Sequence, residues 1–119
     1  MANSCQEFIS TYVKASNHRN SSELILLYKL PLITKCKNGK CLSIEKKEDL
    51  SKYIRNKLTI LPPLLSLEHV GNIGGRFILL KQKAFYINAS EASNNIVAEK
   101  FKDNYLIIAE DILNDICLN

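Results

Sequence analysis

Apolar residues in the first part of the chain recur at the three- and four-residue spacing of an amphipathic helix. A Ser-x-x-Glu capping box at residues 4–7 marks a helix start. The residues that share the apolar face behind it are Phe8, Ile9, Tyr12 and Val13. The polar run at 17–22 ends this segment, so the pattern predicts a first helix between Ser4 and that run.

A short second helix is predicted next, because Leu24, Leu27 and Tyr28 lie on one helical face. Pro31 ends it, since a proline disfavours helical geometry in the residue before it. A third helix is predicted over residues 45–58. The residues of its apolar stripe are Leu50, Tyr53, Ile54 and Leu58.

A β-hairpin is predicted between the second and third helices. Residues 32–36 and 41–44 are short apolar runs around Asn38-Gly39, and an Asn-Gly pair is the strongest short signal for a two-residue turn. With that turn, Cys36 lies opposite Cys41, where antiparallel side chains approach most closely.

Beyond residue 64 the apolar period changes to two, which indicates strands. A Gly-rich turn at 71–75, a polar loop at 88–95 and a turn at 110–111 separate them. The predicted strands are residues 64–70, 76–87 and 96–109, and a last strand that ends near Leu118. Three N-terminal helices followed by long strands predict an α+β fold, in which the helices pack on a curved, mostly antiparallel sheet with a pocket between the layers.

Length and composition favour a single domain over residues 1–119. A chain of 119 residues, 46% of them hydrophobic and 24% charged, matches an ordinary soluble domain. Its net charge of +4 comes mainly from Lys, whereas Arg, which suits base and phosphate contacts better, occurs only at positions 19, 55 and 76. No aromatic residue that could stack on a base lies between the lysines at 35, 37, 40, 46 and 47. The charge pattern therefore argues against a nucleic-acid partner.

The N-terminus and the cysteines indicate the compartment. The first seven residues lack the basic and apolar parts of a secretory signal, and no apolar run has membrane-spanning length, so we expect a cytoplasmic protein without membrane contact. There, the four cysteines are expected to be reduced; in an oxidising compartment they would allow three disulfide connectivities. His18 and His69 do not complete a zinc-binding spacing with them. We expect no metal and no cofactor.

Two residues of the predicted strands could carry acid–base chemistry. Asp103 shares the apolar side of its strand with Tyr105, where burial would raise its pKa and let it act as a general acid. The alternative is an acid near a sheet end that is solvated or paired with a lysine. His69 alternates with Leu67 and would also face inward, although a lone histidine at a strand end more often has a structural role.

The order of these elements resembles the nuclear transport factor two-like superfamily, a cone-shaped fold that includes ketosteroid isomerases and SnoaL-like polyketide cyclases. The segments that carry the resemblance are Tyr12-Val13, residues 22–28, Pro31, Asn38-Gly39, residues 50–54 and residues 101–105. Enzymes, binding domains and structural partners share this fold, so the resemblance implies architecture more firmly than function. It also implies a homodimer formed through the sheet.

The resemblance assigns roles to individual residues. It places the oxyanion tyrosine of ketosteroid isomerases at Tyr12 and their oxyanion acid at Asp103. It places their catalytic carboxylate at Cys36, where this chain has no acid, and the neighbouring Lys35 cannot replace it. A neutral thiol is a poor base for a carbon acid, so ketosteroid isomerase activity is not expected.

Three hypotheses follow. In the first, the protein is a small cytoplasmic protein whose pocket binds a small apolar molecule or a partner. The residues expected to face that pocket are Tyr12, Tyr28, Tyr53, His69 and Asp103. In the second, it is a cofactor-independent isomerase, dehydratase or cyclase, in which Asp103 and His69 transfer the proton and Tyr12 holds an oxyanion. In the third, it is a non-catalytic interaction module that forms a homodimer through its open sheet face and has a collapsed pocket.

Overall fold

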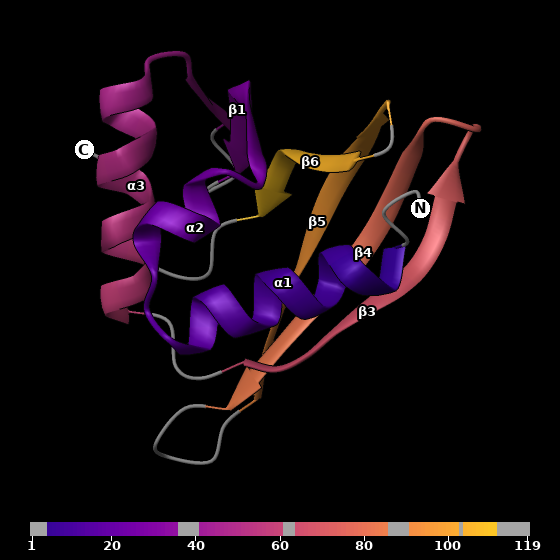
Figure 1. Cartoon of the computed structure of the whole chain (residues 1–119), viewed down its shortest axis with the longest axis horizontal. Helices are drawn as coiled ribbons and strands as arrows, with labels where there is room; N and C mark the ends of the chain where they lie inside the picture. Colours follow the sequence, from indigo (N-terminus) through magenta and orange to yellow (C-terminus); the bar gives the residue numbers. More distant parts are fainter. Residues whose placement is uncertain (1–4, 36–40, 61–63, 86–90, 103, 112–119) are drawn as a thin grey trace.

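The computed structural model describes residues 5–35, 41–60, 64–85, 91–102 and 104–111. Within these ranges the chain forms three helices and six strands (Figure 1). The helices are α1 (Cys5–Asn17), α2 (Ser21–Ile25) and α3 (Lys47–Ile60). The strands are β1 (Tyr28–Lys35), β2 (Cys41–Ile44), β3 (Leu64–Ile73), β4 (Phe77–Phe85), β5 (Glu91–Phe101) and β6 (Asn104–Asp111).

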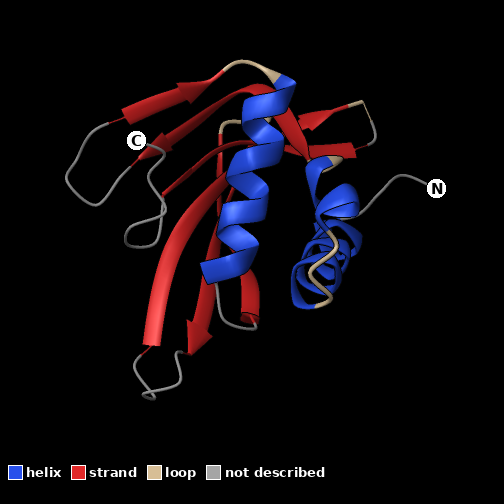
Figure 2. Ribbon diagram, turned by 90° about the vertical axis from the view of Figure 1, so that its left-hand side faces the viewer, coloured by secondary structure: helices blue, strands red, loops and turns tan. Residues whose placement is uncertain are grey.

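All six strands belong to one sheet, in the order β2-β1-β6-β5-β4-β3. Every pairing is antiparallel except that between β1 and β6, which is parallel. The helices lie within the curve of the sheet, where α1 packs against β3 and β6, and α2 packs against α1 and α3 (Figures 1 and 2). This arrangement confirms the predicted α+β fold with helices on a curved, mostly antiparallel sheet.

The helices form where their apolar stripes predict them. Phe8, Tyr12 and Ala15 are buried on one side of α1. Asn20 caps α2, because its side-chain oxygen accepts a hydrogen bond of 3.2 Å from the backbone N–H of Glu23. The buried apolar residues of α3 are Leu50, Tyr53, Ile54 and Leu58. No helix within the described ranges is both long and apolar enough to cross a membrane.

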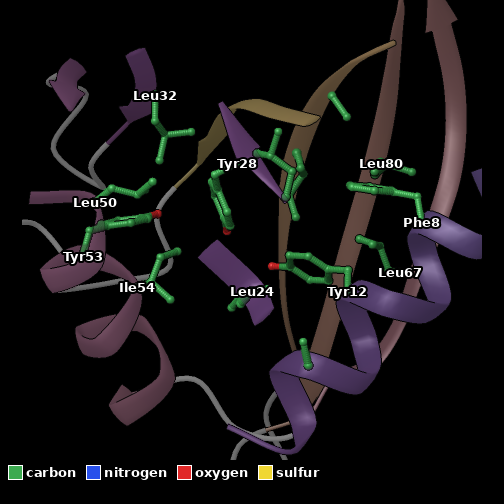
Figure 3. Packing of buried hydrophobic residues seen from close by; sticks show 14 of the residues in the cluster. Phe8, Tyr12, Leu24, Tyr28, Leu32, Leu50, Tyr53, Ile54, Leu67 and Leu80 are labelled. Carbon is green, nitrogen blue, oxygen red and sulfur yellow. The ribbon is translucent and has the colours of Figure 1, made fainter. Parts of the chain in front are cut away.

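The hydrophobic core fills the space between the helices and the concave face of the sheet (Figure 3). Its fully enclosed aliphatic residues come from both layers and are Leu24, Leu32, Ile54, Leu80, Ile96 and Ile107. Full burial of one such side chain contributes about 1.5–3 kcal/mol. The contact between the two layers therefore stabilises the fold and fixes the positions of the residues inside the cone.

The second helix ends earlier than predicted, and Tyr28 belongs to a strand. β1 begins at Tyr28 and contains Pro31. The cause is pairing with β6: the backbone N–H of Ile107 donates to the carbonyl oxygen of Leu27 over 2.7 Å, and Tyr28 is the partner of Ile107 in the sheet. This long-range pairing overrides the local helical spacing on which the prediction was based.

The β1–β2 hairpin has a register one residue away from the predicted one. Leu32 pairs with Ile44, and Lys35 pairs with Cys41, so the partner of Cys41 in the sheet is not Cys36. Cys36, like the Asn-Gly turn, lies outside the described residues. Leu32 and Ile44 are both buried, and a one-residue slip would separate them and exchange the two faces. Core burial, rather than the turn, therefore determines this register.

The strand predicted at 96–109 is in fact two strands, β5 and β6. Phe101 pairs with Asn104, and Lys102 between them has a φ of 56°. A positive φ is uncommon for a residue with a side chain, and this segment contains no Gly or Pro to mark the turn. β5 already begins within the predicted loop 88–95, and the predicted turn at 110–111 is part of β6.

The turn between β3 and β4 is shorter than the Gly-rich segment suggested. Gly71 and Ile73 still belong to β3 and pair with Leu79 and Phe77 of β4. The turn itself covers residues 74–76, where Gly74 has a φ of 64°. Glycine adopts this left-handed conformation without steric cost, which explains its position in the turn.

Candidate functional site

Three tyrosine hydroxyl groups converge in the centre of the cone (Figure 3). Tyr12 comes from α1, Tyr28 from β1 and Tyr53 from α3, and all three side chains are buried. Their rings pack in the core while their hydroxyl groups point toward one another. The structure therefore brings together three of the residues that the sequence predicted to face a pocket.

An ion pair between Lys57 and Glu110 lies among these hydroxyl groups. The Nζ of Lys57 on α3 is 2.7 Å from Oε2 of Glu110 on β6, and the two side chains are 3% and 1% exposed. Lys57 also donates to the hydroxyl oxygens of Tyr12, over 2.7 Å, and Tyr28, over 2.9 Å. An ammonium group has three protons. All donors of Lys57 are therefore engaged by the protein itself.

The tyrosine hydroxyl groups donate in turn to acceptors inside the cone. Tyr28 donates to Oε1 of Glu110 over 2.6 Å, and Tyr53 donates to Oε2 over 2.6 Å. Tyr12 donates to Oε1 of Gln82 over 2.5 Å. The hydroxyl protons of these three tyrosines are thus all directed to buried side-chain oxygens.

Two amides extend this network across the sheet. Nε2 of Gln82 on β4 donates to Oδ1 of Asn94 on β5 over 2.8 Å, and Nδ2 of Asn94 donates to the carbonyl oxygen of Asp111 over 2.9 Å. Both amide side chains are buried. We call the connected side chains the polar cluster; its members are Tyr12, Tyr28, Tyr53, Lys57, Gln82, Asn94 and Glu110.

The environment fixes the protonation states of the polar cluster. Burial, reinforced by the charge of Glu110, raises the pKa values of Tyr28 and Tyr53 well above the usual 10.0. Burial also raises the pKa of Tyr12, although Lys57 opposes this change. Burial alone would lower the pKa of Lys57, but Glu110 and Tyr12 outweigh it and hold that pKa above the usual 10.5. The hydroxyl groups are therefore neutral and Lys57 is a cation at neutral pH.

The polar cluster is a closed arrangement. Lys57 also lies over the rings of Tyr12 and Tyr28, with Nζ 5.2 and 5.6 Å from their centroids. A substrate would have to replace hydrogen bonds that are already made, in a region from which water is excluded. Buried polar groups stabilise a unique structure when each has its partner. The geometry fits a structural centre that fills the cone better than an open active site.

His69 does not reach the polar cluster. Its side chain is exposed, and Nε2 lies 3.0 Å from the carbonyl oxygen of Gly71 and 2.8 Å from Oδ1 of Asn72. His69 pairs with Leu80, which faces the helices, so His69 lies on the helix side of β3, but its side chain there is exposed and is not enclosed with the tyrosines. Asp103 lies outside the described residues.

Four members of the polar cluster were not among the predicted site residues. Lys57 follows Tyr53 by four residues on the apolar stripe of α3, and this spacing could have indicated that Lys57 faces the core. Lysine is almost never fully buried unless it is paired, however, and the sequence did not reveal its partner. Gln82 alternates with the buried Leu80 and could have been placed inward by parity. Glu110 and Asn94 fell in a predicted turn and a predicted loop, so they were not assigned to the sheet at all.

The cysteines offer no site in the described part of the chain. Cys5 is a free, partly buried thiol whose pKa is raised by burial. Among the residues with described positions, no group of three or more His, Cys, Asp or Glu side chains could hold a metal ion. The reduced state of Cys36 and Cys41 stays a prediction.

Comparison with known proteins identifies the fold. No protein-family model matches the chain, and no curated protein matches it. It is similar to the structure of an NTF-2-like protein of unknown function from Shewanella oneidensis, with 14% identity, a TM-score of 0.61, and coverage of 89% of this chain and 93% of that one. It is also similar to a protein with a cystatin-like fold from Nostoc punctiforme, with 10% identity, a TM-score of 0.65, and coverage of 94% and 93%.

A third similar structure is a putative calcium/calmodulin-dependent protein kinase type II association domain from Thiobacillus denitrificans. It is 7% identical, with a TM-score of 0.65 and coverage of 96% of this chain and 98% of that one. Identities this low establish a shared architecture and leave the function open. The chain therefore has the NTF2-like, cystatin-like cone fold that its sequence resembles.

Proposed function

We propose that the protein is a non-catalytic interaction module that forms a homodimer through the outer face of its sheet. The observation that carries this proposal is a row of apolar side chains on the face away from the helices. Leu79 of β4 pairs with Val97 of β5, Val97 pairs with Ala109 of β6, and Ala109 pairs with Ile33 of β1. Directly paired residues point to the same face, so these four side chains form a continuous row, which we call the outer row.

The outer row is accessible in the single chain. The next residues along β4 and β5, Leu80 and Ile96, are fully buried on the helix side, whereas the outer row residues are partly exposed and Ile33 is 43% exposed. A contiguous apolar strip on a soluble protein often marks an interaction surface. A two-fold dimer uses the same patch on both subunits, so a second copy of the outer row would cover the first.

Charged side chains border the outer row. Glu99 on β5 lies 3.1 Å from Nζ of Lys29 and 2.5 Å from Nε of Arg76. Hydrogen bonding to Lys29 and the charge of Arg76 lower the pKa of Glu99, which stays ionised at neutral pH. An apolar centre with a polar rim is the usual composition of an interface between proteins.

Two of the similar solved structures are described as putative kinase association domains. That description belongs to those proteins, and it agrees with a role of this fold in assembly.

The polar cluster supports the non-catalytic part of the proposal. An oxyanion role for Tyr12, or an apolar ligand beside it, requires a free hydroxyl group in an open pocket. The hydroxyl of Tyr12 already donates to Gln82 and accepts from Lys57. The enzymatic alternative also used His69, which is exposed on β3. The first hypothesis, an apolar ligand among the three tyrosines, would therefore need the polar cluster to open.

Sedimentation velocity of the full chain tests the homodimer. We expect the wild type to sediment as a dimer at micromolar concentration, and Val97→Glu to sediment as a monomer because it places a carboxylate in the middle of the outer row. Ile33→Glu, at a more exposed position, should have the same effect. Lys52→Glu, which introduces a carboxylate on the exposed surface of α3, is the matched control and should stay dimeric.

Circular dichroism of each variant separates loss of association from loss of folding. A wild type that is monomeric at high micromolar concentration contradicts the proposal. A dimer that survives both substitutions in the outer row also contradicts it, because the interface must then lie elsewhere.

A further inference from the structure

A half-open pocket of about 240 Å³ lies between α1, the α2–β1 turn and the first residues of β6. α1 contributes Phe8 and Thr11, the turn contributes Leu26 and Leu27, and β6 contributes residues 104–106. None of these residues belongs to the polar cluster. Figure 1 shows α1 passing beside β6 on the helix side of the sheet.

The pocket follows the edge of β6 rather than one of its faces. Side chains of consecutive strand residues point to opposite faces, so a pocket that touches three consecutive residues must border the strand backbone. β1 covers this edge of β6 only from the pair of Tyr28 with Ile107 onward. Within the described ranges, no strand pairs with Tyr105 or Leu106 on that side.

Tyr105 directs its backbone groups toward the uncovered edge. The N–H of Ile107 points to the β1 side, because it donates to the carbonyl oxygen of Leu27. Backbone direction alternates along a strand, so Tyr105, two residues earlier, directs its N–H and C=O to the same side. Among the described residues, nothing pairs with these two groups. The pocket therefore offers the backbone N–H of Tyr105 as a donor and its C=O as an acceptor, which is the pair of groups that one residue of an added strand would bond.

Apolar side chains form one part of the pocket wall, and Thr11 and Asn104 contribute polar groups to the rest. Phe8 is 2% exposed, and its ring packs at a tilt against the ring of Tyr105, with 6.0 Å between the centroids. Leu26 is 74% exposed, the highest value among the large apolar residues that the structure describes. Leu26 therefore places an exposed apolar side chain at the mouth of the pocket.

We propose that this pocket binds an extended peptide segment of a partner protein, which adds to the edge of β6 at Tyr105 and inserts one large apolar side chain. In strand addition, main-chain hydrogen bonds hold the peptide and a side-chain pocket selects it. A volume of about 240 Å³ is smaller than the 300–1,000 Å³ typical of sites for drug-sized ligands, so it suits one side chain better than a whole small molecule. The pocket lies on the helix side of the sheet, so this proposal does not depend on the homodimer.

Nuclear magnetic resonance titration of the isotopically labelled full chain tests the proposal. The probe is the capped tripeptide acetyl-Thr-Leu-Thr-amide. We expect it to shift the amide resonances of Thr11, Leu26 and Tyr105, and to slow hydrogen exchange of the Tyr105 amide. Acetyl-Thr-Ala-Thr-amide lacks the large side chain and isobutanol lacks the peptide backbone, so each should bind roughly tenfold more weakly.

Leu26→Asp should weaken tripeptide binding by about tenfold, because it places a charge at the mouth of the pocket. Ile73→Asp changes another exposed aliphatic residue, at the far end of β3, and should leave binding unchanged. Isobutanol that binds as tightly as the tripeptide overturns the proposal in favour of a small-molecule site. Absence of shifts at millimolar tripeptide, or a Tyr105 amide already protected in the free protein, also overturns it. A monomeric wild type would refute the homodimer and leave these outcomes unchanged.

Discussion

At the scale of single residues, Lys57 shows how a charge is accommodated in the core. Its three protons have three acceptors, and Glu110 supplies the opposite charge at 2.7 Å. Removing one partner of such a pair leaves the other buried and unpaired, which typically costs about 3–5 kcal/mol, whereas replacing both by neutral groups costs far less. A double-mutant cycle is therefore needed to separate the interaction between the two residues from the cost of leaving one of them unpaired.

We expect Lys57→Met to lower the free energy of unfolding by about 3–5 kcal/mol, because Glu110 loses its cation. The double variant Lys57→Met with Glu110→Gln should recover part of that loss. Chemical denaturation of the wild type, both single variants and the double variant measures the coupling.

Lys52→Met, on the exposed side of the same helix, is the control and should change stability by no more than about 0.5 kcal/mol. Equal effects of Lys57→Met and Lys52→Met would show that the buried pair does not stabilise the cone.

The tyrosines of the polar cluster were predictable, whereas the charged residues were not. Tyr12 and Tyr53 lie on helical stripes, where an aromatic ring is expected to be buried and its hydroxyl group needs a partner. Lys57 lies on the same stripe as Tyr53, but a lone lysine gives no sign of the anion that would allow its burial. That anion, Glu110, is 53 residues away in sequence, and only the folded sheet brings the two together.

At the scale of secondary-structure elements, local signals predicted the helices better than the sheet. α1 and α3 follow from their own apolar spacing, which is a property of neighbouring residues. The hairpin register and the β5–β6 turn depend on which side chains the rest of the molecule buries. Burial of Leu32 and Ile44 therefore determines the hairpin register more strongly than the Asn-Gly turn does. The turn at Lys102 does not interrupt the alternation of apolar and polar residues, so the sequence pattern did not reveal it.

Gly74 is the turn residue whose replacement should be most costly. Its φ is 64°, a backbone conformation that is strained for alanine even though the added Cβ would contact no other atom. Gly74→Ala should therefore lower the free energy of unfolding by roughly 1–2 kcal/mol. Gly75→Ala is the matched control: it adds the same methyl group to the same turn, without a positive φ and in open space. Denaturation midpoints of the two variants test this, and equal midpoints would contradict the assigned turn geometry.

At the scale of the whole molecule, the polar cluster makes stability depend on pH. The pKa values of Tyr12, Tyr28, Tyr53 and Lys57 are all raised in the folded state. A group with a raised pKa stabilises the fold fully below its unfolded pKa and loses this contribution as the pH rises toward its folded pKa. The unfolded pKa values are the usual 10.0 for tyrosine and 10.5 for lysine. Stability should therefore fall in alkaline solution.

We expect the midpoint of urea unfolding to be level near neutral pH and to fall from about pH 9 upward. Tyr53→Phe removes one of the groups whose pKa is raised, so the unfolding midpoint of this variant should decrease less steeply as the pH rises above about 9. The variant should also be less stable than the wild type at neutral pH. Unfolding followed by circular dichroism across this range measures both. A midpoint that does not change up to about pH 11 would contradict the raised pKa values.

The position of β6 bears on how the chain is made. β6 lies between β1 and β5, in the middle of the sheet, although it is the last described strand in sequence. During synthesis, β1 and β2 emerge early and cannot join β3, β4 and β5 until residues 104–111 have left the ribosome. Until then, both partial sheets keep an unpaired edge, and such edges favour aggregation. The two partial sheets can therefore join only once this one short segment is available, and the same segment delivers Glu110 to Lys57.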